Sequence, residues 1–351
     1  MLTPTEHDLA AAPPGAATVT FCFSDGVERS VAVPSGGSIL AAGLEAGLPL
    51  THQCRSGTCS SCLATLTAGD TGPVPGSNSS LFASEMAAGK RLLCVSQARG
   101  DCRFALDYAS SGGEQVTTAQ TFVNTVERVA ADVMRLELEL AEGSWIDFRP
   151  GQFIQLSVPG TDQTRSYSIA STPAQLPKIE LLVRLIPGGV MSDWLLNRAA
   201  ADAVVEIAGP YGAFFLREGE KAPHIMIAGG TGLAPMMAMI DQIRARPGRK
   251  PQILLSFGCT SVAGLFHREA LALRQHWLPG LQVHLSVDHG AAVDGVRVGN
   301  PVEVVGQGGA LDPASVAYLC GPPGMVEAAR GHLEALGLSP ENIFSERFVA
   351  S

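Results

Sequence analysis

The sequence predicts a multidomain chain of α+β and α/β type, and three observations support this fold class. The length of 351 residues suits two or three domains at roughly 150 residues each. A cysteine-rich segment, a segment of short strands and a segment of alternating strands and helices follow one another. Apolar residues make up 46% of the chain, which is ample for several packed cores, and charged residues only 16%.

Charge and hydropathy argue against several classes of partner. The formal net charge is −9 with only 24 lysines and arginines, which disfavours binding to a nucleic-acid backbone. No apolar run approaches the roughly 20 residues that span a bilayer, and the first residues carry acids where a signal peptide would be positively charged. We therefore expect a cytoplasmic protein without a nucleic-acid or membrane partner, and we expect a monomer.

The first segment, expected over residues 17–109, combines strands, one helix and six of the 8 cysteines. Ser38 is placed to cap a helix over 38–46, and Gly47 ends it. Small polar residues at 110–117 indicate a linker. The strands expected are Thr18–Phe23, Arg29–Val33, Leu63–Thr67 and a run around Cys102–Leu106.

Four cysteines of this segment have the spacing of a plant-type [2Fe–2S] site. Cys54, Cys59 and Cys62 lie in one short loop with the pattern C-x4-C-x2-C, and Cys94 follows well downstream. The small residues of the loop let backbone N–H groups approach sulfur. The alternative is a structural four-cysteine zinc site, although such sites usually pair two C-x2-C motifs.

The second segment, expected over 118–217, shows closely spaced strands with turn signals between them. This spacing favours a small closed barrel. The strands expected are Phe122–Val129, Val133–Leu140, Gln152–Val158, Ile179–Arg184 and Val204–Ala208.

Two motifs of the barrel segment suit a flavin. Arg165-Ser166-Tyr167-Ser168 could bind a pyrophosphate, pack on the flavin and place a hydroxyl beside it, or it could be only a polar strand end. Gly188-Gly189-Val190-Met191-Ser192 adds two glycines that lead into a helical turn, which we expect Ser192 to cap. Together the two motifs predict flavin binding.

The third segment, expected over 222–351, alternates strands and helices, which implies a parallel sheet. Gly230-Thr231-Gly232 follows the first strand, with Pro235 in the first helical turn, and Cys320-Gly321-Pro322 repeats this strand–loop–helix arrangement. Such glycines can be merely structural, but two loops at the carboxyl ends of parallel strands form a ligand-binding crevice. The elements expected are strands His224–Ala228, Gln252–Phe257, Leu281–Ser286 and Val316–Leu319, and helices Ala234–Arg246 and Pro323–Leu336.

Over residues 17–351 the chain resembles the flavin- and iron–sulfur-dependent reductases of bacterial ring-hydroxylating dioxygenases, especially the benzoate and terephthalate types. The resemblance is carried by CRSGTCSSC, RSYS, GGTGLAP and CGPPGM. It implies an N-terminal β-grasp ferredoxin, a six-stranded flavin-binding β-barrel and a C-terminal parallel-sheet nicotinamide domain. This domain order implies FAD as the flavin.

The resemblance also implies a function. Electrons would pass from NADH to FAD, then to [2Fe–2S], and then to a separate Rieske-type aromatic ring-hydroxylating oxygenase. Two alternatives stay open: the reductase of a di-iron monooxygenase, and a non-catalytic redox carrier or sensor. After the strand at 252–257, no Arg or Lys appears before Arg268 to bind a 2′-phosphate, so we expect a preference for NADH over NADPH.

The residues expected at the sites are of three kinds. The cluster ligands are Cys54, Cys59, Cys62 and Cys94. By resemblance, Cys320 lies beside the nicotinamide and Phe348, close to Glu346, covers the flavin; the catalytic set is Ser168, Cys320, Glu346 and Phe348. The cofactor-binding set is Arg165, Ser166, Tyr167, Ser168, Val183, Gly188, Gly189, Met191, Ser192, Gly230, Thr231, Gly232, Pro235, Cys320, Gly321, Pro322 and Phe348.

Overall fold

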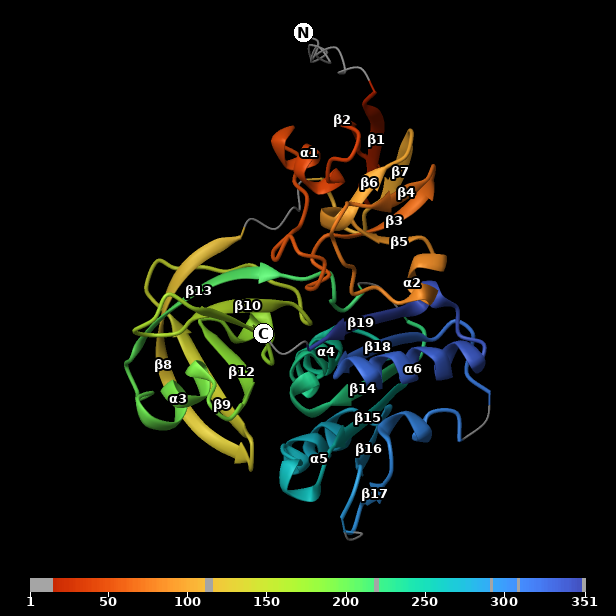
Figure 1. Cartoon of the computed structure of the whole chain (residues 1–351). Coiled ribbons are helices and arrows are strands. Elements are labelled where there is room, and N and C mark those ends of the chain that lie inside the picture. The colour runs from red at the N-terminus through yellow and green to blue at the C-terminus, as the bar shows by residue number, and fades with distance from the viewer. Residues whose placement is uncertain (1–14, 111–115, 218–220, 291–292, 308–309, 349–351) are drawn as a thin grey trace. The chain divides into compact units, whose positions relative to one another are not determined.

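The computed structural model describes residues 15–110, 116–217, 221–290, 293–307 and 310–348 (Figure 1). Residues 111–115 of the expected linker lie outside these ranges. The chain divides into two compact units, residues 1–113 and 114–351. In the described part of the chain, no helix is both long and apolar enough to cross a membrane.

The first unit is built on a five-stranded sheet in the order β2-β1-β7-β3-β5. Ser38 caps α1 by accepting the Ala41 amide at 3.3 Å, as predicted. Phe21, Ile39 and Phe104 are fully buried in the core between the sheet and α1. The elements are β1 (Ala17–Cys22), β2 (Glu28–Val33), α1 (Ile39–Glu45), β3 (Leu63–Ala68), β4 (Thr71–Pro73), α2 (Ala83–Ala87), β5 (Lys90–Leu92), β6 (Ser96–Ala98) and β7 (Cys102–Ala105).

The second unit begins with six antiparallel strands in the order β11-β10-β13-β8-β9-β12. An antiparallel bridge between Ile169 and Leu181 joins the two edges and closes the barrel. The predicted six-stranded barrel is thus confirmed. The elements are β8 (Thr117–Ala130), β9 (Val133–Leu140), β10 (Phe153–Ser157), β11 (Thr164–Ser168), β12 (Lys178–Arg184), α3 (Val190–Asn197) and β13 (Val204–Tyr211).

Two details of the barrel differ from the sequence predictions. The residues Arg165–Ser168 belong to a strand of their own, β11, which was not among the expected strands because its polar residues hid it from the apolar pattern. Ser192 does not cap α3, because Gly189 occupies the N-cap position. The Ser192 hydroxyl instead accepts the Ile186 amide at 2.8 Å, which closes the turn before the helix.

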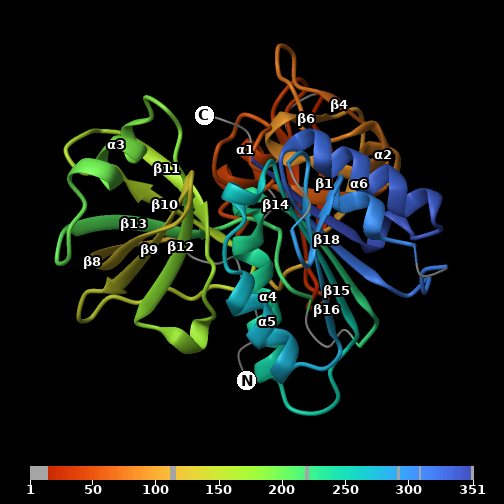
Figure 2. The ribbon, with the colours of Figure 1, turned by 90° about the horizontal axis from the view of Figure 1, so that it is seen from below.

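The remainder of the second unit, the parallel-sheet lobe, has six strands in the order β17-β16-β15-β14-β18-β19, all parallel. Figure 2 shows α4 and α5 on one face of this sheet and α6 on the other, the layering that alternating strands and helices predict. The elements are β14 (His224–Gly229), α4 (Leu233–Ala245), β15 (Ile253–Cys259), α5 (Arg268–Trp277), β16 (Leu281–Val287), β17 (Val296–Val298), β18 (Val316–Gly321), α6 (Pro323–Ala335) and β19 (Ile343–Arg347).

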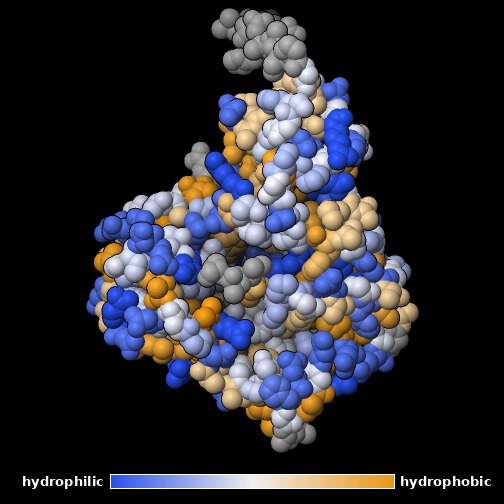
Figure 3. Space-filling model, viewed as in Figure 1, coloured by the Kyte–Doolittle hydropathy of each residue, from blue (hydrophilic) through white to orange (hydrophobic). Residues whose placement is uncertain are grey.

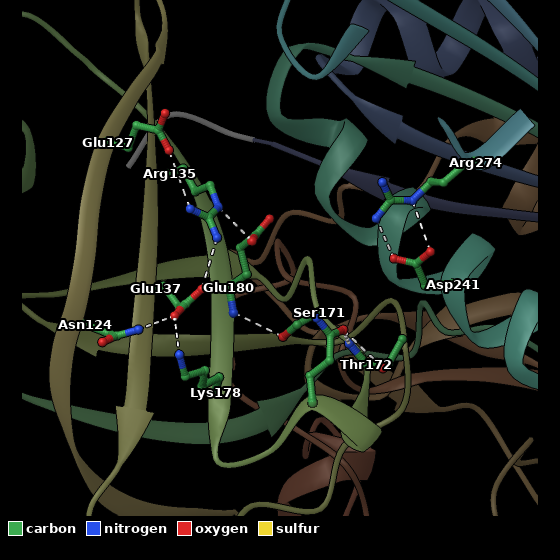
Figure 4. Close-up of polar contacts among 11 residues, drawn as sticks. Asn124, Glu127, Arg135, Glu137, Ser171, Thr172, Lys178, Glu180, Asp241 and Arg274 are labelled. Atoms are coloured by element: carbon green, nitrogen blue, oxygen red, sulfur yellow. Dashed lines mark hydrogen bonds and ion pairs between the residues drawn. The ribbon is translucent and has the colours of Figure 1, made fainter. Parts of the chain in front are cut away.

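Ion pairs and hydrogen bonds hold neighbouring elements of the second unit together (Figure 4). Arg135 of β9 donates to Glu180 of β12 at 2.8 Å, and the Glu180 amide donates to the Ser171 hydroxyl at 3.0 Å. The segment that leaves β11 is therefore held against β12. On the lobe, Arg274 of α5 donates to both carboxylate oxygens of Asp241 on α4, which joins the two helices on one face of the sheet.

Candidate functional site: a cysteine loop and a two-lobed carboxyl site

The cysteine loop lies between α1 and β3, with a backbone shaped by close approaches. Gly57 has φ +81°, and a Cβ there would lie 2.1 Å from the Asn78 carbonyl oxygen. Only glycine fits this position without displacing the backbone. Arg55 and Ser60 also adopt left-handed conformations, with φ of 53° and 57°. This local strain is typical of a loop shaped for binding.

The four predicted thiols are grouped as two pairs. Cys59 donates to the Cys54 sulfur, and Cys62 donates to the Cys94 sulfur. The hydrogen bond from Cys59 lowers the pKa of Cys54 to about 3, while the same hydrogen bond and burial raise the pKa of Cys59. Thiolates are the form in which cysteine binds metal. Two thiol pairs match a two-iron cluster, in which each iron takes two cysteines.

Backbone amides of the loop point at these sulfurs. The amides of Ser56 and Cys59 each donate to the Cys54 sulfur at 3.4 Å, and the Cys54 amide donates to Cys59 at 3.4 Å. The Gly57 amide donates to Cys94. N–H groups aimed at thiolates stabilise their negative charge, so the donor set and the loop both fit a [2Fe–2S] cluster.

The predicted flavin motif lies along β11, with a different exposure at each residue. Ser168 is buried at the end of the strand, Tyr167 is half-buried against the barrel core, and Ser166 is exposed. Burial raises the pKa of the Tyr167 hydroxyl. Arg165 donates to the Thr164 carbonyl and to Gln163, both at 2.8 Å, at the exposed start of the strand. A phosphate would have to replace these two partners.

The second predicted flavin motif forms the turn into α3. Gly188 has φ +74°, with open space where a Cβ would stand, whereas the Gly189 amide already donates to the Ile186 carbonyl at 2.9 Å. Met191 is buried in the barrel core, as is Val183 on β12. Only the main chain of Val183 could therefore face a ligand.

The two glycine loops of the lobe contact each other at the carboxyl ends of β14 and β18. A Cβ on Gly232 would lie 2.2 Å from the Cys320 carbonyl oxygen, and one on Gly321 would lie 3.0 Å from the Gly229 nitrogen. A Cβ on Gly230 would meet nothing within 4 Å. The loops are thus closely packed against each other but open at Gly230, as a crevice for a nucleotide requires.

The other predicted residues of this crevice lie around the same point. Thr231 is half-exposed beside Gly230, and Pro235 is buried in the first turn of α4. Pro322 is the N-cap of α6. Prediction omitted Gly229 and Met325, although a Cβ on Gly229 would lie 2.7 Å from the Met325 sulfur. Gly229 belongs to the GGTGLAP motif and Met325 to the CGPPGM motif, so these motifs could have indicated both residues.

Three predicted catalytic residues lie close together, although one comes from the barrel and two from the parallel-sheet lobe. The Ser168 hydroxyl of β11 donates to Glu346 Oε2 of β19 at 2.9 Å. The Cys320 thiol of β18 lies 3.9 Å from the same oxygen. Phe348 is half-buried, and its amide donates to the Gly321 carbonyl at 3.0 Å, which continues the line of β19 past the crevice. A hydroxyl and a thiol therefore both lie close to one oxygen of the Glu346 carboxyl.

Burial changes the protonation of this group. Desolvation raises the pKa of Glu346 to about 7, while the hydrogen bonds from Ser168 and Cys320 oppose the shift. Burial and the neighbouring carboxyl raise the pKa of Cys320. The carboxyl can therefore gain or lose a proton near neutral pH, and the thiol stays neutral.

Comparison with known families places three domain types in series along the chain. Residues 22–99 match a 2Fe-2S iron-sulfur cluster binding domain, residues 120–216 an oxidoreductase FAD-binding domain, and residues 226–331 an oxidoreductase NAD-binding domain.

Relatives over nearly the whole length are electron-transfer proteins. The anthranilate 1,2-dioxygenase electron transfer component of Acinetobacter baylyi is 31% identical over 95% of this chain and 98% of its own. The toluate 1,2-dioxygenase electron transfer component of Pseudomonas putida is 33% identical over 94% and 97%. The propane 2-monooxygenase reductase component of Mycolicibacterium goodii is 31% identical over 89% and 92%.

The chain belongs to the flavin- and iron–sulfur-dependent electron-transfer reductases of oxygenases. Among solved structures, a cytochrome P450 reductase from Amycolatopsis has a TM-score of 0.69 and 29% identity, covering 95% of this chain and 99% of its own. The predicted fold class and the cofactors FAD, [2Fe–2S] and NADH are confirmed. This reductase passes electrons from NADH through FAD and the cluster to a separate oxygenase. The zinc-site and non-catalytic carrier alternatives are therefore excluded.

Proposed function

We propose that this reductase serves a Rieske-type oxygenase that hydroxylates an aromatic ring. The observation that carries the proposal is the likeness, over nearly the full length of both chains, to electron transfer components of the anthranilate and toluate dioxygenases. A monooxygenase partner is the second candidate, because the propane monooxygenase reductase component is 31% identical. The domain limits proposed are 17–109, 118–217 and 222–351, with a linker at 110–117.

We propose that the thiol pairs hold the cluster. Cys54 and Cys59 would bind one iron, and Cys62 and Cys94 the other, because the thiols of each pair lie within hydrogen-bonding reach of each other. The amides on Cys54, Cys59 and Cys94 would then stabilise the negative charge of the thiolates.

We propose that Ser168 and Glu346 hold a proton beside the flavin. Bound FAD accepts two electrons at once from NADH, and the cluster passes electrons on singly. The Glu346 carboxyl, with a pKa of about 7, can keep a proton and exchange it through the Ser168 hydroxyl 2.9 Å away. The buried, neutral Cys320 thiol lies 3.9 Å from the same carboxyl oxygen.

The binding roles follow from where each residue lies. We propose that Arg165, Ser166 and Tyr167 on β11 bind the flavin together with the turn at Gly188, Gly189, Met191 and Ser192 and the main chain of Val183. Gly230, Thr231, Gly232 and Pro235, with Gly321 and Pro322, would bind the nicotinamide nucleotide at the helix N-termini. Phe348 would cover the flavin from the end of β19.

We also propose that the chain acts as a monomer in the cytoplasm. Figure 3 shows hydrophilic residues over much of the visible face, with apolar residues scattered in small patches, which suits a monomer. None of the eight cysteines is joined to another by a disulfide. Size-exclusion chromatography with light scattering should give a mass near the chain's 36.5 kDa.

The test of the proposed function is reconstitution. The purified protein should contain about one FAD and two irons per chain and no zinc, and should reduce an artificial acceptor with NADH. Product formation should then be measured with a purified aromatic ring-hydroxylating dioxygenase and with a purified propane monooxygenase. We expect at least about tenfold faster turnover with the dioxygenase. Faster turnover with the monooxygenase would overturn the proposed partner but not the reductase activity.

A further inference from the structure

Arg217 connects the barrel to the parallel-sheet lobe through two aromatic rings. Its Cζ lies 4.1 Å from the ring centroid of Phe215, which follows β13, and 4.1 Å from that of Phe344 on β19. Its backbone amide donates to the Tyr318 hydroxyl of β18 at 3.1 Å. A guanidinium between two rings is attracted to the negative face of each. Arg217 thus bonds the barrel side to both strands that carry the carboxyl site.

Phe344 and Tyr318, which Arg217 contacts on the sheet, lie on the same sheet face as Cys320 and Glu346. Tyr318 pairs with Phe344 across β18 and β19, and Cys320 pairs with Glu346 two residues further on. Because side chains alternate along a strand, residues two apart share a face. The rings of Tyr318 and Phe344 stack at 5.8 Å. The Tyr318–Phe344 pair is therefore the neighbour of the Cys320–Glu346 pair on the same face of the two strands.

The hydrogen bond between Ser168 and Glu346 depends on how the barrel and the parallel-sheet lobe are held together. Ser168 belongs to the barrel and Glu346 to the lobe, and their 2.9 Å hydrogen bond would be lost if β19 moved by about 1 Å. Displacements of this size at a reacting group can cost about a hundredfold in rate. We propose that Arg217 is a positioning residue, which keeps Glu346 against Ser168 by clamping Phe344 to the barrel. This inference rests on the proposed role of Glu346.

Arg149 provides the matched control. Its Cζ lies over the same Phe215 ring at 3.5 Å. Arg149→Met therefore removes one guanidinium from this ring but leaves the contact of Arg217 with Phe344 in place. Arg217→Met removes a cation of the same kind and also releases Phe344.

The experiment is a double-mutant cycle on the full chain loaded with FAD and cluster. The limiting rate of flavin reduction by NADH and the NADH KM are measured for Arg217→Met and Arg149→Met, alone and combined with Glu346→Gln. We expect Arg217→Met to lower the limiting rate at least about tenfold, with the KM within about twofold, and Arg149→Met to change neither by more than about twofold. In the Glu346→Gln background, Arg217→Met should lower the rate by less than about twofold further, because the contact that it positions is already lost.

A second measurement does not depend on turnover. Hydrogen exchange of the amides at 343–348, followed by mass spectrometry, should be faster in Arg217→Met than in Arg149→Met. Arg217→Lys keeps a cation but not the planar group, so its rate should fall between those of the wild type and Arg217→Met; it serves as the test variant if Arg217→Met does not fold.

Two results would overturn the inference: equal rates for Arg217→Met and Arg149→Met, or the same fractional loss from Arg217→Met in both backgrounds. An unchanged rate in Glu346→Gln alone would instead remove the proposed role of Glu346, and the inference with it.

Discussion

The cysteine loop of the first unit and the carboxyl site of the second are assembled over very different distances along the chain. Three of the four thiols lie in one loop, and the fourth, Cys94, follows after β3, β4, α2 and β5. Ser168 and Glu346, by contrast, are separated by 178 positions and meet only because the barrel packs on the lobe.

This difference determines what each site depends on. The loop is shaped by the left-handed conformations of Arg55 and Ser60 and by the close approach of Gly57 to Asn78, which lies before α2 in the same unit. The carboxyl site depends on the ladder between β18 and β19 and on contacts between lobes. Damage to one site should therefore leave the other intact.

The largest effect is expected from Cys59→Ser. Loss of one of four thiolates should remove the cluster and with it all electron delivery to the oxygenase, while NADH still reduces the flavin at a rate within about twofold of wild type. Iron content, the visible spectrum and stopped-flow reduction of the flavin measure the two outcomes separately.

Cys22→Ser is the control for this variant, because Cys22 lies on β1 in the same unit, apart from the quartet. It should retain both iron and electron delivery. If Cys59→Ser also lost flavin reduction, the two sites would not be independent.

The next largest effect is expected from Glu346→Gln, which keeps the shape of the side chain but not its exchangeable proton. Flavin reduction should slow by about a hundredfold, the lower range for loss of a general acid or base. Cluster content should not change. Stopped-flow reduction at saturating NADH measures the effect, and Glu341→Gln, at an exposed position just before β19, should react as wild type.

Glu346→Gln also tests how the rate of flavin reduction depends on pH. The pKa of Glu346 is raised to about 7, so the carboxyl is mostly protonated below pH 7 and mostly ionised above it. Ser168 and Cys320 both contact its Oε2 oxygen. If the protonated form is the proton donor, the wild-type rate falls as pH rises from 6 to 8, whereas Glu346→Gln gives a flat profile. An equal fall in both proteins would show that another group titrates.

The comparison between the sites also explains what could be predicted from the sequence. The cysteine spacing and the glycine loops are local signals. So are the four buried strands and two helices expected in the lobe, which appear close to their expected limits, whereas α5 and β17 were not among the expected elements. β11 and β19 were missed because TRSYS and IFSER are short and carry polar residues where the strands face the site. Glu346 was found only by resemblance, since no local pattern indicates that its carboxyl meets Ser168.

A smaller but measurable effect is expected from Arg165→Ala. A charge-assisted hydrogen bond to phosphate is worth about 1.5–3 kcal/mol, so the Kd for FAD should rise roughly tenfold or more. Fluorescence titration of the apoprotein with FAD measures this, with Arg128→Ala on the barrel strand β8 as the control. Unchanged affinity would mean that Arg165 keeps its bonds to Thr164 and Gln163 when the flavin binds.

The smallest expected effect is the choice between NADH and NADPH. β15 ends at Cys259, and Thr260 and Ser261 follow, without a cation to bind a 2′-phosphate. Arg268 donates its guanidinium to the Asp294 carbonyl at 3.1 Å, and burial lowers the pKa of His267, so that its ring is neutral at pH 7. We therefore expect kcat/KM for NADH to exceed that for NADPH by at least about tenfold, or about 1.4 kcal/mol. Steady-state assays with both nucleotides measure the ratio, which Arg268→Ala should leave within about twofold of wild type. If the ratio of kcat/KM for NADH to that for NADPH were near one and rose in Arg268→Ala, Arg268 would leave Asp294 to bind the 2′-phosphate. The nucleotide site would then depend, like the carboxyl site, on a contact that no local sequence pattern reveals.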